Sequence, residues 1–247
     1  MKRAVLFAAV LVLAAGGVRA ADDAAVAVVK KGVEAHGGEE ALKKVKGGEY
    51  KVEGEVTVQG EKSKYTGVVS YALPDKFRTS MDTAIGGTKS TQVIVVNGDK
   101  VKVTGNGKAV ELKAELRGEF QQMAAIQEVI LLYPLLDEKK FTLKAEKDEK
   151  VDDKEAAVVL ASRKGMKDVR LYFDKKSGEL VRYTHKMPDP YGQETTAETT
   201  NSEFKKFDGV LVPTVHKVKQ ANKEYMTIKV LDAKLVEKPD LKAYAID

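Results

Sequence analysis

The three histidines are the side chains with the clearest capacity for chemistry, because imidazole can act as a general acid or base and can bind a metal. His185 and His216 lie on separate predicted strands, and Asp189 follows His185 across a short loop. His36 precedes two glycines at a predicted helix end, where a capping role explains it. A zinc or acid–base site needs several such groups to converge. We therefore predict no metal, no cofactor and no catalytic residue, and hence no enzyme.

Other short motifs are better explained by structure than by chemistry. Segment 85–89 (IGGTK) lacks the spacing and the following helix of a phosphate-binding loop, so we interpret it as a hairpin loop. No serine lies in a nucleophile-elbow sequence. We interpret the threonine-rich segment 194–201 (ETTAETTN) as an edge strand or a solvent-facing strand rather than a binding strip.

The first residues have the pattern of a secretory signal peptide. A basic start at residues 1–3 precedes an apolar run over residues 4–17 and a small residue, Ala20, at the cleavage position. The run is short for a membrane span, and no second run follows, although an uncleaved anchor is the alternative. We therefore predict a signal peptide over residues 1–20 and a periplasmic mature chain from Ala21. That chain should have no transmembrane segment, and without cysteine it has no lipid-attachment site.

Composition excludes several partners. Removal of the leader lowers the formal net charge from +5 to +2, and charged residues of both signs make up 32% of the chain. This balance argues against nucleic acid, which requires a clustered basic face. The absence of cysteine excludes a disulfide framework, so the core itself must stabilise the fold. We expect a soluble monomer.

The hydrophobic period changes from helical to strand-like near residue 49. Residues 22–45 have apolar side chains at helical spacing, interrupted once at Gly37-Gly38. From Glu49 apolar and charged residues alternate, and Asn97-Gly98 is a strong hairpin signal. The predicted strands of this half are 49–57, 65–71, 77–81, 91–96 and 101–103.

A helix is predicted to follow these strands. Leu116, Phe120, Met123, Ile126 and Ile130 lie at helical spacing, and the chain is apolar nearly all round over residues 129–136, so its end must be buried. We expect Pro134 to mark the helix end. Strands then resume at 141–145, 156–161, 169–173, 180–185, 203–207, 210–218 and 225–231.

Short connections between the predicted strands indicate antiparallel pairing throughout. The sequence contains no linker or low-complexity seam, so residues 21–247 should form a single domain. We predict a mainly β, α+β fold: a curved antiparallel sheet of about eleven strands, with an N-terminal helix and a central apolar helical insertion.

Four segments carry a resemblance to a known family. Residues 71–78 (YALPDKFR) and 93–100 (VIVVNGDK) are similar to the strand pair with the pattern P-x-x-F-R and D/N-G found in the lipoprotein-carrier superfamily of LolA and LolB. Residues 173–180 (FDKKSGEL) and 207–213 (FDGVLVP) resemble the second half of the broader LolA-like group. The likeness covers most of the mature chain, and its motifs are turn chemistry and strand pattern.

The resemblance implies a half-open β-barrel that is apolar on its concave side and closed by a helical lid or plug. Such a carrier holds acyl chains by burying them from water, at roughly 0.8 kcal/mol per methylene, without covalent chemistry. The expected ligand-binding residues fall into a wall on the strands and a lid on the central helix. The wall comprises Val52, Val56, Tyr65, Val69, Tyr71, Phe77 and Ile94, and the lid comprises Phe120, Met123, Ile126, Ile130 and Tyr133.

Three functions follow, in decreasing order of support. The first is a non-catalytic carrier or binder of a lipid or of lipoprotein acyl chains, with an envelope membrane protein as a further partner. The second is an envelope scaffold with the same fold and a filled interior. The third is a hydrolase or metal-dependent enzyme, which would require the rings of His185 and His216 to meet in a cleft. The classical carriers place a lid-latching arginine directly before the proline of the first motif, whereas this chain has Leu73 there.

Overall fold

The computed structural model describes residues 22–58, 60–85, 88–188 and 193–246. The predicted signal peptide, the two glycines of segment 85–89 and Asp189 lie outside the described residues. No helix among the described residues is long and apolar enough to cross a membrane.

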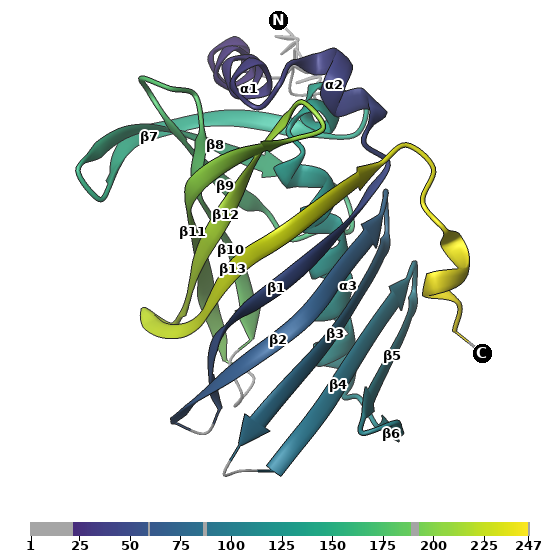
Figure 1. Cartoon of the computed structure of the whole chain (residues 1–247). Helices are drawn as coiled ribbons and strands as arrows, with labels where there is room; N and C mark the ends of the chain where they lie inside the picture. The colour runs from purple at the N-terminus through teal and green to yellow at the C-terminus, as the bar shows by residue number, and fades with distance from the viewer. Residues whose placement is uncertain (1–21, 59, 86–87, 189–192, 247) are drawn as a thin grey trace, which may run out of the picture.

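Thirteen antiparallel strands of the described chain form one sheet (Figure 1). Strands β6 to β1 follow each other in reverse sequence order, β1 pairs with β13, and β13 to β7 follow in turn. Strands β6 and β7 are the two free edges, so the sheet is open. The strands are β1 (Gly47–Val58), β2 (Glu61–Ala72), β3 (Lys76–Ile85), β4 (Thr88–Asn97), β5 (Lys100–Gly105), β6 (Lys108–Val110), β7 (Thr142–Val151), β8 (Lys154–Ser162), β9 (Val169–Asp174), β10 (Leu180–Pro188), β11 (Glu194–Phe207), β12 (Val210–Gln220) and β13 (Lys223–Val236).

The expected number of about eleven strands was too low. Strand β6 has only three residues, and all three are exposed, so it carries no alternating pattern that could reveal it. The interpretation of segment 194–201 as an edge or solvent-facing strand was also wrong. This segment begins β11, which pairs with β10 on one side and β12 on the other, and Ala197, Thr199 and Asn201 are buried.

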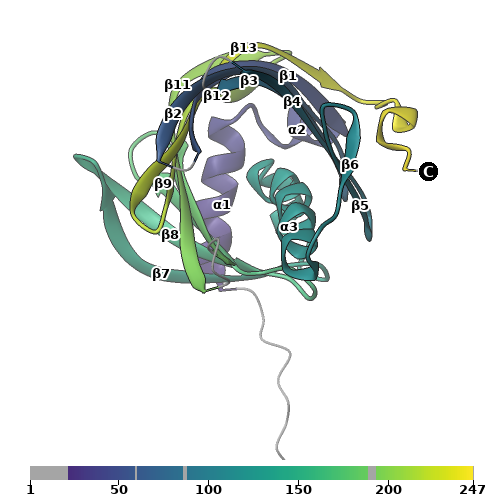
Figure 2. The same ribbon diagram turned by 90° about the horizontal axis from the view of Figure 1, so that it is seen from below.

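Helices lie against one face of the sheet, which bends around them in the view of Figure 2. As predicted, the N-terminal helical region is interrupted at Gly37-Gly38, giving α1 (Asp23–Ala35) and α2 (Glu39–Lys44). The Asp22 carboxylate accepts hydrogen bonds from the backbone N–H of Ala24 (3.0 Å) and of Ala145 (3.1 Å). It therefore caps α1 and joins it to β7.

The central insertion forms α3 (Ala114–Ile130) and the 3-10 helix η1 (Tyr133–Leu136). The α-helix ends at Ile130 and not at Pro134. Leu132 has a φ of +62°, and Pro134 lies in the first turn of η1, where its missing N–H costs nothing. A C-terminal 3-10 helix, η2 (Leu241–Tyr244), places Tyr244 on the opposite face of the sheet, against Ala72 and Val95.

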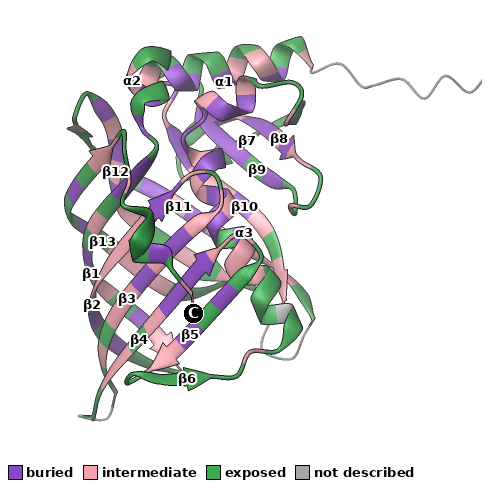
Figure 3. Cartoon of the chain, turned by 90° about the vertical axis from the view of Figure 1, so that its right-hand side faces the viewer, coloured by how far each residue is buried: buried purple, intermediate pink, exposed green. Residues whose placement is uncertain are grey.

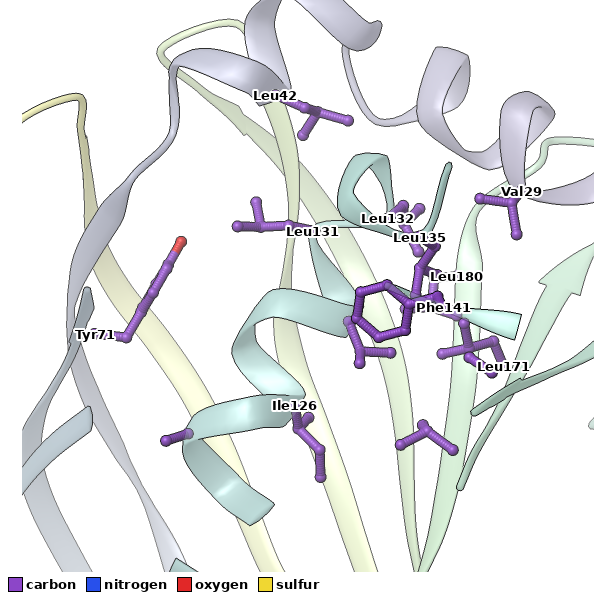
Figure 4. Packing of buried hydrophobic residues seen from close by; sticks show 14 of the residues in the cluster. Val29, Leu42, Tyr71, Ile126, Leu131, Leu132, Leu135, Phe141, Leu171 and Leu180 are labelled. Atoms are coloured by element: carbon purple, nitrogen blue, oxygen red, sulfur yellow. The ribbon is translucent and has the colours of Figure 1, made fainter. Parts of the chain in front are cut away.

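Residues along each strand alternate between the face that carries α1 and α3, here called the inner face, and the outer face. Figure 3 shows the alternation, and β5 has buried Val101 and Val103 between exposed lysines. The main core lies where α1, α3 and η1 meet the inner faces of β3–β5 and β7–β9. Leu132, Leu135, Phe141, Leu171 and Leu180 pack together there (Figure 4).

Gly54 allows a close backbone approach in the middle of the sheet. It lies on β1 opposite Ile228 of β13 and Tyr65 of β2. The Tyr65 ring crosses over it, and the Tyr65 hydroxyl donates a hydrogen bond to the Thr227 carbonyl at 2.9 Å. A Cβ at Gly54 would lie 1.9 Å from that carbonyl oxygen and 3.0 Å from the Tyr65 ring. Only glycine fits this position.

Candidate functional site

All seven predicted wall residues lie on the inner face, as the strand registers show. Tyr71 is opposite Phe77, Val69 is opposite Tyr50, and Val52 is opposite Val230. They divide between two groups. Tyr71, Phe77 and Ile94 belong to the main core, whereas Val52, Val56 and Tyr65 form a second cluster with Val230 and Ala233. Val69 packs against both clusters.

One face of α3, here called the inner stripe, remains incompletely covered. It comprises Leu116, Phe120, Met123, Gln127 and Ile130, which recur at the three- and four-residue spacing of a single helix face. The side chains of Leu116 and Met123 are 45% and 37% exposed, and the other three are half-buried. Of the predicted lid residues, Ile126 is instead buried in the main core, and Tyr133 lies in η1, where its hydroxyl accepts from Lys46 Nζ at 3.2 Å.

The anchors of α3 determine where the inner stripe points. At about 100° per residue, Gln121 and Glu128 lie on the far side of the helix from the stripe. Gln121 donates to the Gly98 carbonyl in the β4–β5 turn (3.4 Å), and Glu128 binds residues next to β7 and β8. These strands lie near the two free edges of the sheet. The inner stripe therefore lies on the side of α3 turned away from these two anchors, and its Phe120 and Ile130 pack against the main core.

The inner face of the central strands also retains accessible apolar surface. The side chains of this face are of two kinds: Val52, Val56, Tyr65 and Val230 are buried, whereas others are only half-buried. Half-buried apolar side chains therefore occur both on the inner stripe and on the inner face of the central strands. The half-buried apolar side chains on the strand side are Tyr50, Val69, Met81, Val218, Met226 and Ile228.

Buried polar side chains fix α3 to the second half of the sheet, and the sequence did not reveal them. The Glu128 side chain is only 6% exposed and forms ion pairs with Lys140 and with Arg163, the latter at 2.5 Å. The Gln122 amide donates to the Lys167 carbonyl (3.1 Å) and accepts from the Lys167 N–H (3.0 Å). Glutamate and glutamine are usual on exposed helix faces, so only the apolar surroundings of Glu128 could have indicated burial.

Two hollows of the described surface have no residue of the inner stripe in their lining. One of about 500 Å³ lies between the first turns of α3 and the ends of β10 and β11, and Gly118, Gly165, Lys167 and Pro188 are among its lining residues. The other, of about 900 Å³, is lined mainly by outer-face residues of β1–β4 and β13 with charges of both signs, including Glu53, Lys64, Asp82 and Lys229. The mixed charges favour solvent rather than an apolar ligand.

His185 and His216 do not meet. Strand β11 lies between their strands, where His185 is opposite Ala197 and His216 is opposite Asn201. Among the described residues, no group of three or more histidines and carboxylates could hold a metal. His36 has a structural role: Leu211 O lies 2.9 Å from its Nδ1, and the Leu180 N–H donates to its Nε2 at 3.1 Å. This neutral ring joins α1 to β10 and β12.

The histidines predict a loss of stability in mild acid. Burial lowers the pKa of His185 and of His216 to about 4, and it also lowers the pKa of His36. Between about pH 6.5 and 4 the unfolded chain binds protons that the folded chain does not. The free energy of unfolding therefore decreases as the pH is lowered through this range. For each of His185 and His216 we expect the free energy of unfolding to fall by up to about 2 kcal/mol when the pH is lowered from 7 to 5. Urea unfolding at both pH values measures this fall. In the double variant H185Q/H216Q the free energy of unfolding should differ much less between the two pH values.

No model of a known protein family and no curated protein sequence matches this chain. Solved structures do match. A LolA superfamily protein from Nitrosomonas europaea has 13% identity and a TM-score of 0.57, with 90% of this chain and 97% of that chain covered. The chain has a LolA-like fold. A DUF1329 family protein from Desulfovibrio piger has 9% identity and a TM-score of 0.55, covering 90% and 97% of the two chains. An outer membrane lipoprotein-sorting protein domain from Vibrio parahaemolyticus has 11% identity and a TM-score of 0.52, covering 90% and 96%.

These likenesses extend over nearly the full length of each solved chain, so the LolA-like fold includes both halves of the sheet. At such low identity they establish the fold and not the activity. The predicted resemblance to the LolA-like group is confirmed at that level. The ligand-binding role of the wall and lid residues remains a prediction.

Proposed function

We propose that the protein is a non-catalytic periplasmic carrier or binder of an apolar ligand, either a lipid or the acyl chains of a lipoprotein. The ligand lies between the inner stripe of α3 and the inner face of the central strands, and α3 serves as the lid of a half-barrel. What supports the proposal is that apolar side chains of the inner stripe and of the central strands both retain exposure, with Leu116 and Met123 the most exposed of the stripe. A LolA-like fold and the predicted signal peptide agree with this role.

The chemistry of the site favours binding over catalysis. The two surfaces are mostly aliphatic, methionine and tyrosine side chains, and the two histidines on separate parts of the inner face do not converge. Burying each methylene of an acyl chain contributes roughly 0.8 kcal/mol, so a modest length of chain gives tight and reversible binding.

Replacing Met123 with aspartate tests the proposal. The side chain is exposed enough for the variant to fold, but a carboxylate on the inner stripe would have to lose water when a ligand binds. We expect lipid to co-purify with the mature chain from the periplasm and to be absent from M123D. Native mass spectrometry and lipid extraction measure both.

The matched control is L231D. Leu231 is 53% exposed but lies on β13 at its bulge, away from the inner stripe, so the same change should leave the bound lipid in place. A wild-type chain that is free of lipid and does not bind N-phenyl-1-naphthylamine, an uncharged apolar fluorophore, would contradict the carrier function. The scaffold function would then be preferred.

A further inference from the structure

Charge is strongly segregated between the two faces of the central sheet. In a chain with 32% charged residues, the inner-face positions in the middle of β1, β2, β13, β12, β11 and β10 are uncharged, and the charged residues in the same register, Glu61, Glu203, Lys205 and Lys223, are exposed and lie towards strand ends. The outer positions between them carry many charges, among them Lys51, Glu53, Lys64, Lys217 and Lys229. The inner stripe of α3 is uncharged as well. An ionised group next to the uncharged middle of these strands would have no counter-ion there.

Polar groups of the inner face lie on β2 and β3, where Ser63 and Thr79 are buried, and on β10–β12. Asn201 donates through its Nδ2 to the Leu180 carbonyl at 2.9 Å, so its Oδ1 is the acceptor for His216 Nδ1, also at 2.9 Å. These two side chains satisfy each other. His185 differs, because neither ring nitrogen has a hydrogen-bond partner among the described residues, and its Nδ1 is buried.

The buried Nδ1 indicates which nitrogen of His185 carries the proton. An unpaired buried N–H is costlier than an unpaired lone pair, so the neutral ring keeps its proton on Nε2. The ring as a whole is only half-buried, which leaves Nε2–H available as a donor on the inner face. His185 is opposite Val169 of β9, near Lys167 and Pro188, which line the hollow of about 500 Å³. Lys167, the cation whose charge acts on His185, is already paired with Glu119.

From this arrangement we propose that the ligand is an uncharged amphiphile, whose acyl chain lies between the two apolar surfaces and whose ester or amide carbonyl accepts a hydrogen bond from His185. The proposal rests on the carrier function and specifies its ligand class. An ionised fatty acid is disfavoured, because its carboxylate would lose water beside a lysine, Lys167, that already pairs with Glu119. A carbonyl needs only a donor, and His185 offers one.

Competition binding with two lipids of the same chain tests the ligand class. Delipidated mature chain is loaded with N-phenyl-1-naphthylamine at about pH 8, and 1-monoolein and oleate are each used as the competitor. We expect monoolein to displace the fluorophore at a concentration at least about tenfold lower than oleate. Equal or tighter binding of oleate would overturn the ligand class and leave the carrier function intact. No uptake of the fluorophore would instead count against the carrier function itself.

Two variants test the role of His185. H185F keeps the ring shape and removes the donor, so monoolein should bind about tenfold more weakly, the affinity equivalent of one hydrogen bond. H185Q restores a side-chain N–H and should recover most of that loss. Affinity for the fluorophore, which needs no donor, should be the same in all three proteins and shows that each is folded. Unchanged monoolein affinity in H185F would refute the hydrogen bond to His185.

Discussion

Replacing Gly54 with alanine should destabilise the protein by about 3 kcal/mol or more. The new Cβ would lie 1.9 Å from the Thr227 carbonyl oxygen, which is backbone and cannot move aside alone. Relief would require β1 and β13 to separate where the two halves of the sheet join, and the Tyr65 ring would have to move as well. Urea unfolding of G54A measures the loss of free energy, and failure to accumulate as a folded protein is the extreme form of the same result.

Two control substitutions separate the clash from its consequences. Y65F removes only the hydrogen bond to Thr227 and should cost about 1 kcal/mol. G118A places a Cβ where nothing lies within 4 Å, inside α3, and should stabilise the protein by up to about 1 kcal/mol. If G54A were no more destabilising than Y65F, the close approach of β1 and β13 at this point would be disproved.

Replacing Glu128 with alanine should cost about 3 kcal/mol and loosen α3. The carboxylate is nearly fully buried, and its loss leaves the Arg163 guanidinium, itself only 19% exposed, without a counter-ion. The guanidinium carbon lies 5.2 Å from the centre of the Phe141 ring, so the unpaired charge would remain against the main core. We expect faster amide hydrogen exchange along α3 together with the lower unfolding free energy.

The double variant E128M/R163M provides the control. Replacing both charges by apolar side chains of similar length should recover much of the lost stability, because the penalty in E128A comes from the unpaired charge rather than from the missing contact. If the double variant is as unstable as E128A, the ion pair itself stabilises α3. If E128A behaves like the wild-type protein, Glu128 does not anchor the helix.

The strand pattern was predictable because inner and outer residues alternate strongly. On β1 and β2 valine and tyrosine alternate with lysine and glutamate, and this alternation by itself assigns Val52, Tyr65 and Val69 to one face. The interrupted N-terminal helix and the turn at Asn97-Gly98 were predictable from glycine and asparagine in the same way. The LolA-like fold followed from turn motifs of this kind.

Features that depend on long-range contacts were not predictable. Glu128 and Gln122 have the composition of a solvent-facing helix, and their burial results from partners that lie 12 to 45 residues away in sequence. The alternation of threonine and glutamate in β11 looked solvent-facing because no apolar side marked it, yet β10 and β12 enclose it. How much of the inner stripe stays exposed depends on how the distant strands pack around α3, which no local pattern records.

The pairing of β1 with β13 has a consequence for how the chain acquires its structure. These strands are the first and the last of the sheet in sequence, and they pair along most of their length in its middle. During synthesis the two halves can form their local hairpins separately, but they cannot be joined until residues 223–236 have left the ribosome. Closure of so long a loop is entropically costly and slow. The nascent chain should therefore remain incompletely folded until β13 has been made, a state that would suit the export expected from the predicted signal peptide.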